Sequence, residues 1–146
     1  MKAILQRVKK AEVEIENKTY SAIQEGILIL FGVEKNDTSD MIDFFVNKVL
    51  NLRIFEDENE KMNLSIKDIK GEILVVSQFT LASDCKKGLR PSFDNAMEPK
   101  SAKEYYEIFV SKLKESNLTV KTGIFGAMMN VSLINNGPVT FILEKK

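Results

Sequence analysis

The chain has 146 residues, 44% of them hydrophobic, and its 21 Lys and Arg balance its 21 Asp and Glu. This length fits a single domain over residues 1–146, and the interspersed charges exclude a basic tail or an acidic disordered segment. With no histidine and one cysteine, Cys85, the chain lacks Ser-His-Asp and Cys-His devices, histidine ligands and thiolate clusters, so we expect no metal and no cofactor.

No targeting or membrane-spanning segment is indicated. The N-terminal residues are charged from Lys2 onward, and the longest apolar stretch, Ile27–Val33, is far shorter than the roughly 20 residues that a membrane helix needs. A lone cysteine is typical of a reducing compartment. We therefore expect a soluble, cytoplasmic protein that does not enter the membrane.

The first part of the chain predicts two strands and a helix. Apolar and acidic residues alternate over Ala11–Glu16, which indicates a strand with one solvated face. The apolar run Ile27–Val33 follows Gly26 and predicts a strand buried on both faces. A helix is predicted over Ser39–Leu52 because its apolar residues recur at helical spacing. These residues are Ile42, Phe45, Val46 and Val49. The acidic stretch that follows, residues 56–61, is predicted to be a turn or loop.

The second part predicts three more strands and a second helix. Another apolar run, Ile73–Phe79, follows Gly71 and again indicates a strand buried on both faces. A helix is predicted from about Lys100 to Ser116, with Pro99 at its start. Its apolar stripe consists of Ala102, Tyr106, Phe109, Val110 and Leu113. Residues 128–134 and 139–143 predict two further strands. The fold class is therefore α+β, with a mixed or antiparallel sheet rolled into a barrel-like core and two main helices packed outside.

The segment from Leu81 to Glu98 has no periodicity and is predicted to be a long loop. Structureless segments of this length in compact domains are usually functional or mobile. It contains Lys86, Lys87 and Arg90. This small basic cluster either meets phosphate or is solvated surface.

Three side chains with hydroxyl or amide groups, those of Ser77, Gln78 and Thr80, gather around Phe79 at the end of the third predicted strand. Main-chain N–H groups at a strand end lack a partner strand, and such donors stabilise the oxyanion of acyl transfer by about 2.7–4 kcal/mol each. The alternative is local, because Ser77 and Thr80 can also satisfy neighbouring backbone groups.

Three other positions have both a functional and a structural interpretation. Gly137-Pro138 either offers main chain that a ligand can approach closely or forms a tight turn between two strands. Arg7 stands in an apolar strand pattern, either on an exposed face or as a buried guanidinium bound to backbone carbonyls. The segment Phe125–Met129 either lines a pocket or is a strand with a flexible glycine.

Two of these motifs together resemble those of the D-aminoacyl-tRNA deacylase family. They are Ser77-Gln-Phe-Thr-Leu and Asn136-Gly-Pro-Val-Thr. The resemblance continues in Gln6-Arg-Val, Arg53-Ile-Phe, Lys61-Met-Asn-Leu, Arg90-Pro-Ser-Phe, Thr122-Gly-Ile-Phe-Gly-Ala and Val131-Ser-Leu. It therefore covers the chain from residue 1 to about residue 143.

The resemblance implies a homodimer that hydrolyses the ester between a D-amino acid and the 3′ end of tRNA, and also removes glycine mischarged on alanine tRNA. In that family, residues matching Ser77–Thr80 form the catalytic floor of the pocket. A cis Gly137-Pro138 would reach into the pocket of the other subunit and reject L-aminoacyl groups, and Arg7 would orient it. Phe125 and Met129 would lie near the bound aminoacyl-adenosine.

The resemblance also implies that the 2′-hydroxyl of the terminal ribose assists the reaction. Thr80 is a candidate nucleophile, but no neighbouring residue in the sequence offers a base. We therefore favour attack by water, with the N–H groups around Phe79 and Thr80 as the oxyanion hole. Two alternatives are a non-catalytic RNA-binding module of the same fold and a small-molecule esterase or peptidase.

Overall fold

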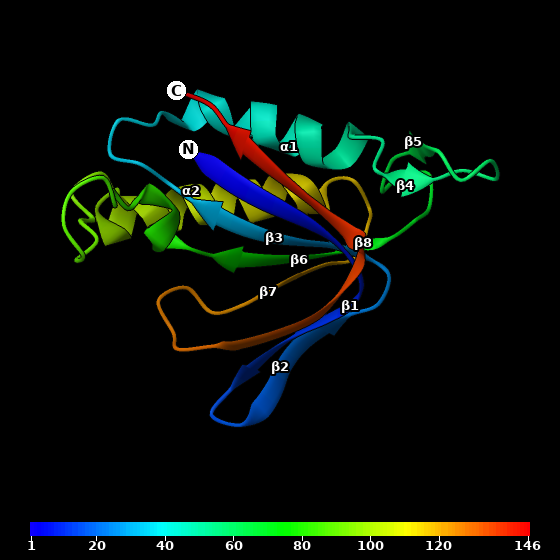
Figure 1. The fold of residues 1–146 in the computed structure, drawn as a ribbon, viewed down its shortest axis with the longest axis horizontal. Helices are drawn as coiled ribbons and strands as arrows, with labels where there is room; N and C mark the ends of the chain where they lie inside the picture. The colour runs from blue at the N-terminus through cyan, green and yellow to red at the C-terminus, as the bar shows by residue number, and fades with distance from the viewer.

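Two long strands, β1 (Lys2–Ile15) and β8 (Asn130–Glu144), pair antiparallel along almost their whole length. On its other edge β1 pairs with two strands. Its first half pairs with β3 (Gly26–Gly32) and its second half pairs with β2 (Lys18–Ile23). The sheet curls between these two halves (Figure 1). The computed structural model describes residues 1–146.

The sheet has the order β2-β1-β3-β6-β7, with β8 beside β1. The β3–β6 and β6–β7 pairs are parallel and the pairs made by β1 are antiparallel. The remaining elements are η1 (Ser39–Met41), α1 (Ile42–Asn51), β4 (Phe55–Glu56), β5 (Met62–Leu64), β6 (Glu72–Ser77), η2 (Phe79–Ala82), α2 (Pro99–Lys114) and β7 (Val120–Thr122). This nearly closed mixed sheet with two helices confirms the predicted fold class.

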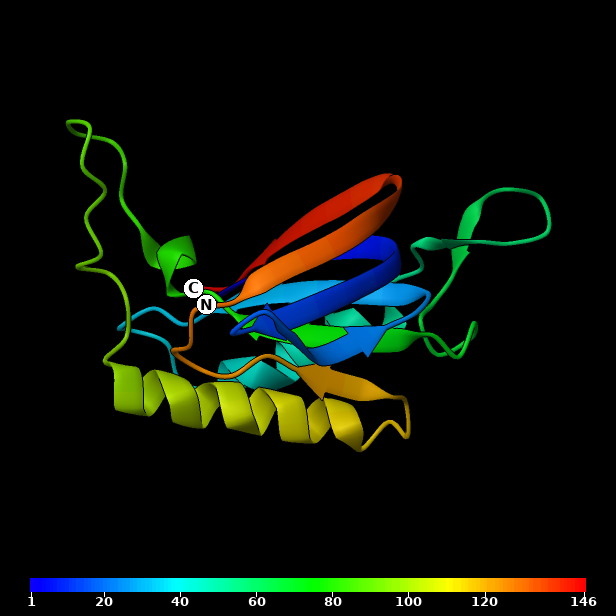
Figure 2. The same ribbon diagram turned by 90° about the horizontal axis from the view of Figure 1, so that it is seen from below.

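Both helices pack against the sheet and against each other, and α2 runs beneath the strands in Figure 2. The core between them is centred on Phe31 of β3. Its ring stacks on Phe109 of α2 with centroids 4.2 Å apart, and Phe45 of α1 meets its edge at 5.8 Å. A second, smaller cluster lies within the curl of the sheet and includes Val8, Leu28 and Leu74. Because β3 contributes to both clusters, it is buried on both faces as predicted.

The helices begin close to the predicted positions. The first starts with the 3-10 turn η1 and becomes α-helical at Ile42. The second is capped by Glu98, whose carboxylate accepts hydrogen bonds from the N–H groups of Lys100 and Ser101 at 3.1 and 3.2 Å. These bonds stabilise the ionised carboxylate and lower its pKa. No helix is long and apolar enough to cross a membrane.

The predicted interruption between residues 134 and 139 is wrong, because β8 continues through it as one strand. Residues before and after the interruption both pair antiparallel with β1, so β8 stays beside β1 where the two strands bend together (Figure 1). Asn135 is opposite Val8 and Thr140 is opposite Gln6, so four residues of β8 face only Arg7. The Asn-Gly-Pro sequence therefore makes a bulge within one bent strand and does not separate two strands. The short strands β2 and β7 are not predicted from the sequence.

We expect Phe109→Ala to lower the free energy of unfolding by about 3–5 kcal/mol, because it leaves a cavity against the fully buried Phe31 stack. Urea unfolding monitored by circular dichroism measures this change. The control is Leu89→Ala, at a fully exposed position, which should stay within about 0.5 kcal/mol of the parent chain. Equal effects of the two substitutions would contradict this account of the core.

Candidate active site

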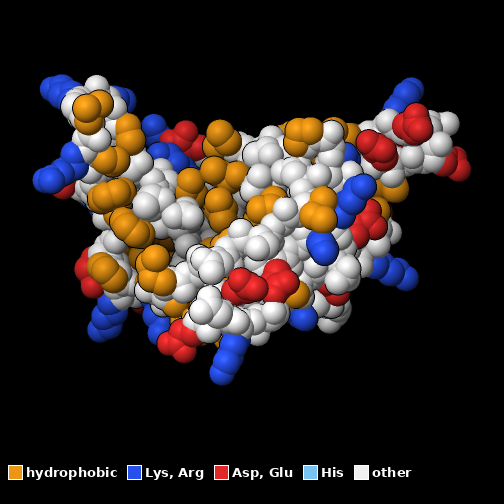
Figure 3. Space-filling view, turned by 60° about the horizontal axis from the view of Figure 1, so that its bottom comes forward, with side chains coloured by type: hydrophobic (Ala, Val, Ile, Leu, Met, Phe, Trp, Pro, Cys, Tyr) orange, Lys and Arg blue, Asp and Glu red, His pale blue; other side chains and the backbone are white.

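A pocket of about 670 Å³ opens where β6 ends, between the sheet, the N-terminal end of α2 and the segment before β8. Most of its lining is apolar. It includes the strand end Val76–Ser77, Phe79 of η2, Phe93 and Met97 of the loop before α2, and residues 125–129. Figure 3 shows hydrophobic side chains gathered on the side of the molecule where that loop projects.

Ser77, Gln78 and Phe79 line one wall of this pocket, whereas Thr80 is exposed and lies outside the lining. Ser77 is the last residue of β6, and the Gln78 N–H donates to the Phe31 carbonyl at 2.8 Å. The chain then turns into η2. The Gln78 side-chain amide donates to the Thr80 hydroxyl oxygen at 2.5 Å. Phe79, with 59% of its side chain exposed, packs against Phe93 at 5.1 Å between ring centroids.

Two main-chain donors at this turn are free. The N–H groups of Phe79 and Thr80 belong to the first turn of η2 and donate to no acceptor within the chain, as is normal at the start of a helix. The next amide, that of Leu81, already bonds to the Gln78 carbonyl at 3.2 Å. The strand end thus presents two adjacent donors where an apolar pocket meets solvent.

The titratable groups that line this pocket are poor proton acceptors. The Glu98 carboxylate is bonded to the amides that begin α2, and these bonds lower its pKa. The Tyr106 hydroxyl donates to the Val75 carbonyl at 2.8 Å, and burial raises its pKa. Neither group is poised to take or give a proton near neutral pH.

Phe125 and Met129 line the same pocket as Ser77, Gln78 and Phe79. The Phe125 ring is 5.8 Å from that of Tyr106, between centroids. The Met129 sulfur fits against Gly123, where a Cβ atom would come within 2.5 Å of it. Sequence reasoning missed Tyr106 and Phe93 as lining residues. Tyr106 belonged to a helical apolar stripe, a signal that does not distinguish a pocket wall from the core.

Gly137 and Pro138 lie far from Ser77–Thr80 in the same chain. They form the bulge of β8, at the end of the sheet away from η2 (Figure 2), and their peptide bond is cis. Ser77 is in register with Phe31 and hence with Ala3, whereas the bulge begins beside Val8. Five residues of extended β1 separate these levels, or about 17 Å.

Arg7 is buried and binds the bulge. Its Nε donates to the Asn136 carbonyl at 2.9 Å, and its Nη1 donates to the Ile54 carbonyl at 2.7 Å. A third nitrogen, Nη2, is 3.5 Å from the exposed Glu56 carboxylate. Of the two alternatives for Arg7, the structure shows the buried guanidinium bound to backbone carbonyls and not the exposed side chain. The side-chain oxygen of Asn135 completes the bulge by accepting from the Val139 N–H at 2.9 Å.

The basic residues of the loop between η2 and α2 are exposed. The loop is pinned at its base by two backbone hydrogen bonds between Asp84 and Ser92, of 2.8 and 3.0 Å. Lys86, Lys87 and Arg90 lie beyond this pair, outside the pocket lining.

The chain is similar in sequence to one family of known proteins over almost its whole length. A family model described as D-Tyr-tRNA(Tyr) deacylase matches residues 4–144. The D-aminoacyl-tRNA deacylase of Aquifex aeolicus is 59% identical over 146 residues, which cover 100% of this chain and 99% of that protein. The D-aminoacyl-tRNA deacylase of Thermodesulfovibrio yellowstonii is 56% identical, with 100% of both chains covered.

Two solved structures share the fold. One, described as c-Myc DNA Unwinding Element Binding Protein, has a TM-score of 0.94 and 43% identity, and covers 100% of this chain and 99% of its own. The other, described as a probable eukaryotic D-amino acid tRNA deacylase, has a TM-score of 0.84 with 97% of each chain covered. At 16% identity, the second shows the fold alone.

We expect Arg7→Met to lower the free energy of unfolding by about 1–3 kcal/mol, because the Ile54 and Asn136 carbonyls lose their donors. Arg7→Lys should recover only part of this loss, since one ammonium cannot reproduce the planar fork. Urea unfolding checks both variants against Lys9→Met, an exposed change on the same strand. Equal stability of Arg7→Met and Lys9→Met would contradict the structural role of Arg7.

Proposed function

Because the chain belongs to the D-Tyr-tRNA(Tyr) deacylase family, we propose that it is a D-aminoacyl-tRNA deacylase acting at the Ser77–Thr80 pocket. It hydrolyses the ester between a D-amino acid and the 3′ end of tRNA and releases both. The observation that supports this site is the pair of free amides, of Phe79 and Thr80, beside an apolar pocket. The cytoplasm, where aminoacyl-tRNA is made and used, is the expected compartment.

The reaction uses main-chain donors in place of a titratable side chain. When water attacks the ester carbonyl, negative charge develops on its oxygen, and the Phe79 and Thr80 amides stabilise that charge. Thr80 is a poor candidate for the nucleophile, because its oxygen accepts from Gln78 and no base lies beside it. We assign the assisting hydroxyl to the 2′ position of the terminal ribose.

A second copy of the chain completes the site. The separation of about 17 Å along β1 keeps Gly137-Pro138 away from the Ser77–Thr80 pocket of its own chain. The outer edge of β8 pairs with no strand and bears Ile134 and Ile142, which are 47% and 73% exposed. A long unpaired edge strand is normally covered. A symmetric dimer would cover this edge and the two isoleucines while bringing each Gly137-Pro138 to the partner's pocket.

Chirality is read by exclusion. A rigid main-chain segment, Gly137-Pro138, meets the amino group and the α-hydrogen of a D-aminoacyl ester but leaves no room for an L side chain. Steric exclusion rejects an isomer more firmly than the loss of one contact. Glycine has no side chain to exclude, so glycine mischarged on alanine tRNA is a second substrate. Phe125 and Met129 contact the terminal adenosine.

Binding of tRNA is local. With equal numbers of acidic and basic residues, the chain has no overall attraction for RNA. Affinity then rests on the acceptor end and a few phosphates near Lys86, Lys87 and Arg90. The alternative, a non-catalytic RNA-binding module, has no specific support in the structure, and an ester-cleavage assay separates the two.

We expect D-tyrosyl-tRNA to be deacylated and L-tyrosyl-tRNA to survive, as measured by release of labelled tyrosine. Thr80→Ala should retain activity within about ten-fold, whereas a 2′-deoxy terminal adenosine should lose roughly 100-fold or more, because it lacks the assisting hydroxyl. Circular dichroism controls for folding of the variant. Near-total loss in a folded Thr80→Ala would return the nucleophile role to Thr80.

Mixed dimers test the second copy. Gly137→Ala places a Cβ atom 2.6 Å from the Val139 side chain at a φ of +136°, which distorts the bulge. Ser77→Phe places a large side chain in the lining of the pocket and fills it. Each homodimer should be inactive. A purified heterodimer of the two should regain about half of the parent activity. One of its two sites then combines an intact pocket from one chain with an intact Gly137-Pro138 from the other. An inactive, folded heterodimer would mean that each site is built within one chain.

A further inference from the structure

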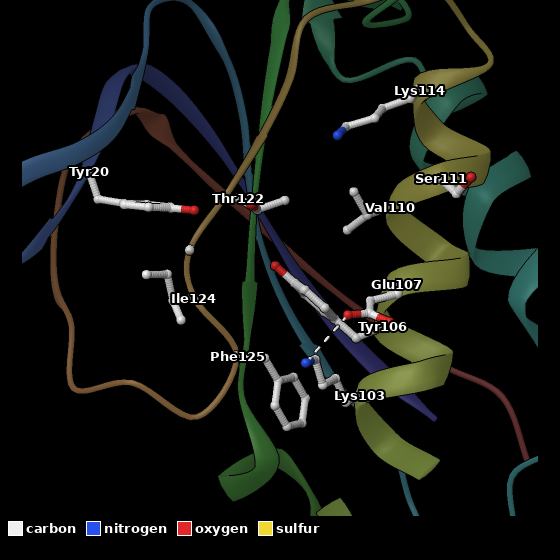
Figure 4. Close-up of a pocket in the computed structure, with 11 residues that line it drawn as sticks. Tyr20, Lys103, Tyr106, Glu107, Val110, Ser111, Lys114, Thr122, Ile124 and Phe125 are labelled. Atoms are coloured by element: carbon white, nitrogen blue, oxygen red, sulfur yellow. Dashed lines mark ion pairs between the residues drawn. The ribbon is translucent and has the colours of Figure 1, made fainter. Parts of the chain in front are cut away.

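A second hollow, of about 440 Å³, lies beside the Ser77–Thr80 pocket, between β2, one face of α2 and the segment that follows β7. Figure 4 shows Tyr20 reaching in from β2 and the Lys114 ammonium pointing in from α2. Thr122 of β7 lies between them, and Glu107 and Ser111 of the helix also line the hollow. The hollow is open, and its lining mixes polar and charged side chains with apolar ones, whereas the pocket that it adjoins is mostly apolar.

The two cavities share a wall. Tyr106 and Phe125 line both of them, and their tilted rings are 5.8 Å apart between centroids. A linear ligand whose last unit occupies the larger pocket therefore has its preceding unit at the hollow. We propose that the hollow binds the nucleotide preceding the terminal adenosine of the substrate tRNA, an assignment that rests on the proposed function.

The chemistry of the hollow suits one nucleotide of single-stranded RNA. Its volume is in the range of small-ligand sites. Tyr20 is 51% exposed and offers a ring face, and bases of any sequence stack on aromatic rings beside a positively charged groove. The Glu107 carboxylate, together with the Ser111 and Thr122 hydroxyls, can bond to base amines and ribose hydroxyls.

Lys114 supplies the charge for the phosphate. Lys103 also lines the hollow, but its ammonium pairs with Glu107 at 3.7 Å, so their charges offset each other. Lys114 makes no ion pair, whereas its neighbour Lys112 is bound to Asp43 of α1 at 2.7 Å and faces away from the hollow. The hollow thus carries one uncompensated positive charge, as expected for one backbone phosphate.

The test compares two D-tyrosyl esters, one of adenosine alone and one of the trinucleotide cytidylyl-cytidylyl-adenosine. We expect the parent chain to cleave the trinucleotide ester with a kcat/KM about ten-fold higher. The double variant Tyr20→Ala/Lys114→Ala should bring this ratio close to one without changing cleavage of the adenosine ester. Lys112→Ala removes a lysine of the same helix, and Tyr20→Phe retains the ring, so both should keep the parent ratio.

A parent ratio near one, or equal slowing of both esters by the double variant, would overturn this assignment. If the double variant does not fold, the single variant Lys114→Ala, at an exposed position, must lower the ratio of kcat/KM between the trinucleotide and adenosine esters. An unchanged ratio overturns the assignment. Cleavage of the adenosine ester reports on the proposed function alone. Failure of the parent chain to cleave either D-ester would remove that function and this inference with it.

Discussion

The fold depends on one geometric constraint, the shared pairing of β1 with β8 on one edge and with β3 on the other. Paired strands fix distances along the chain, so the levels of Ala3 and Val8 on β1 stay about 17 Å apart. The free amides of η2 lie at one level and the Gly137-Pro138 bulge at the other. Neither segment can approach the other without breaking the ladder, and this separation supports a site assembled from two copies.

A chain without histidine suits the chemistry of this pocket. An aminoacyl ester is already activated, so its cleavage needs charge stabilisation more than acid–base catalysis. The polar side chains around the pocket serve structure instead. Glu98 caps α2, the Tyr106 hydroxyl bonds to β6, and Gln78 bonds to Thr80. The Phe79 and Thr80 amides remain as free donors beside the pocket, and the proposed function assigns the charge stabilisation to them. Their positions are fixed by the strand end and by the first turn of η2.

Tyr106 connects the core to both cavities. Its ring is packed in the main cluster with Phe31 and Phe109, its hydroxyl is bound to Val75, and its edge separates the pocket from the hollow beneath Tyr20. A residue fixed this firmly makes a rigid partition. The order of nucleotides along the substrate would then be set by the distance between two preformed cavities rather than by movement of a loop.

The sequence by itself predicted the two helices, the strands that are buried on both faces, and the polar segment Ser77–Thr80 at a strand end. It could do so because apolar periodicity and strand ends are local properties that neighbouring residues fix. It also carried the family resemblance through short motifs. Only the tertiary structure decided that residues 130–144 form one strand, that Arg7 is buried under its bulge, and that Tyr106 borders two cavities. These features depend on which residue of β1 lies opposite which residue of β8, and on how α2 packs against the sheet. The pairing of β1 with β8 joins residues more than 100 positions apart, and no local pattern encodes it or the packing of α2.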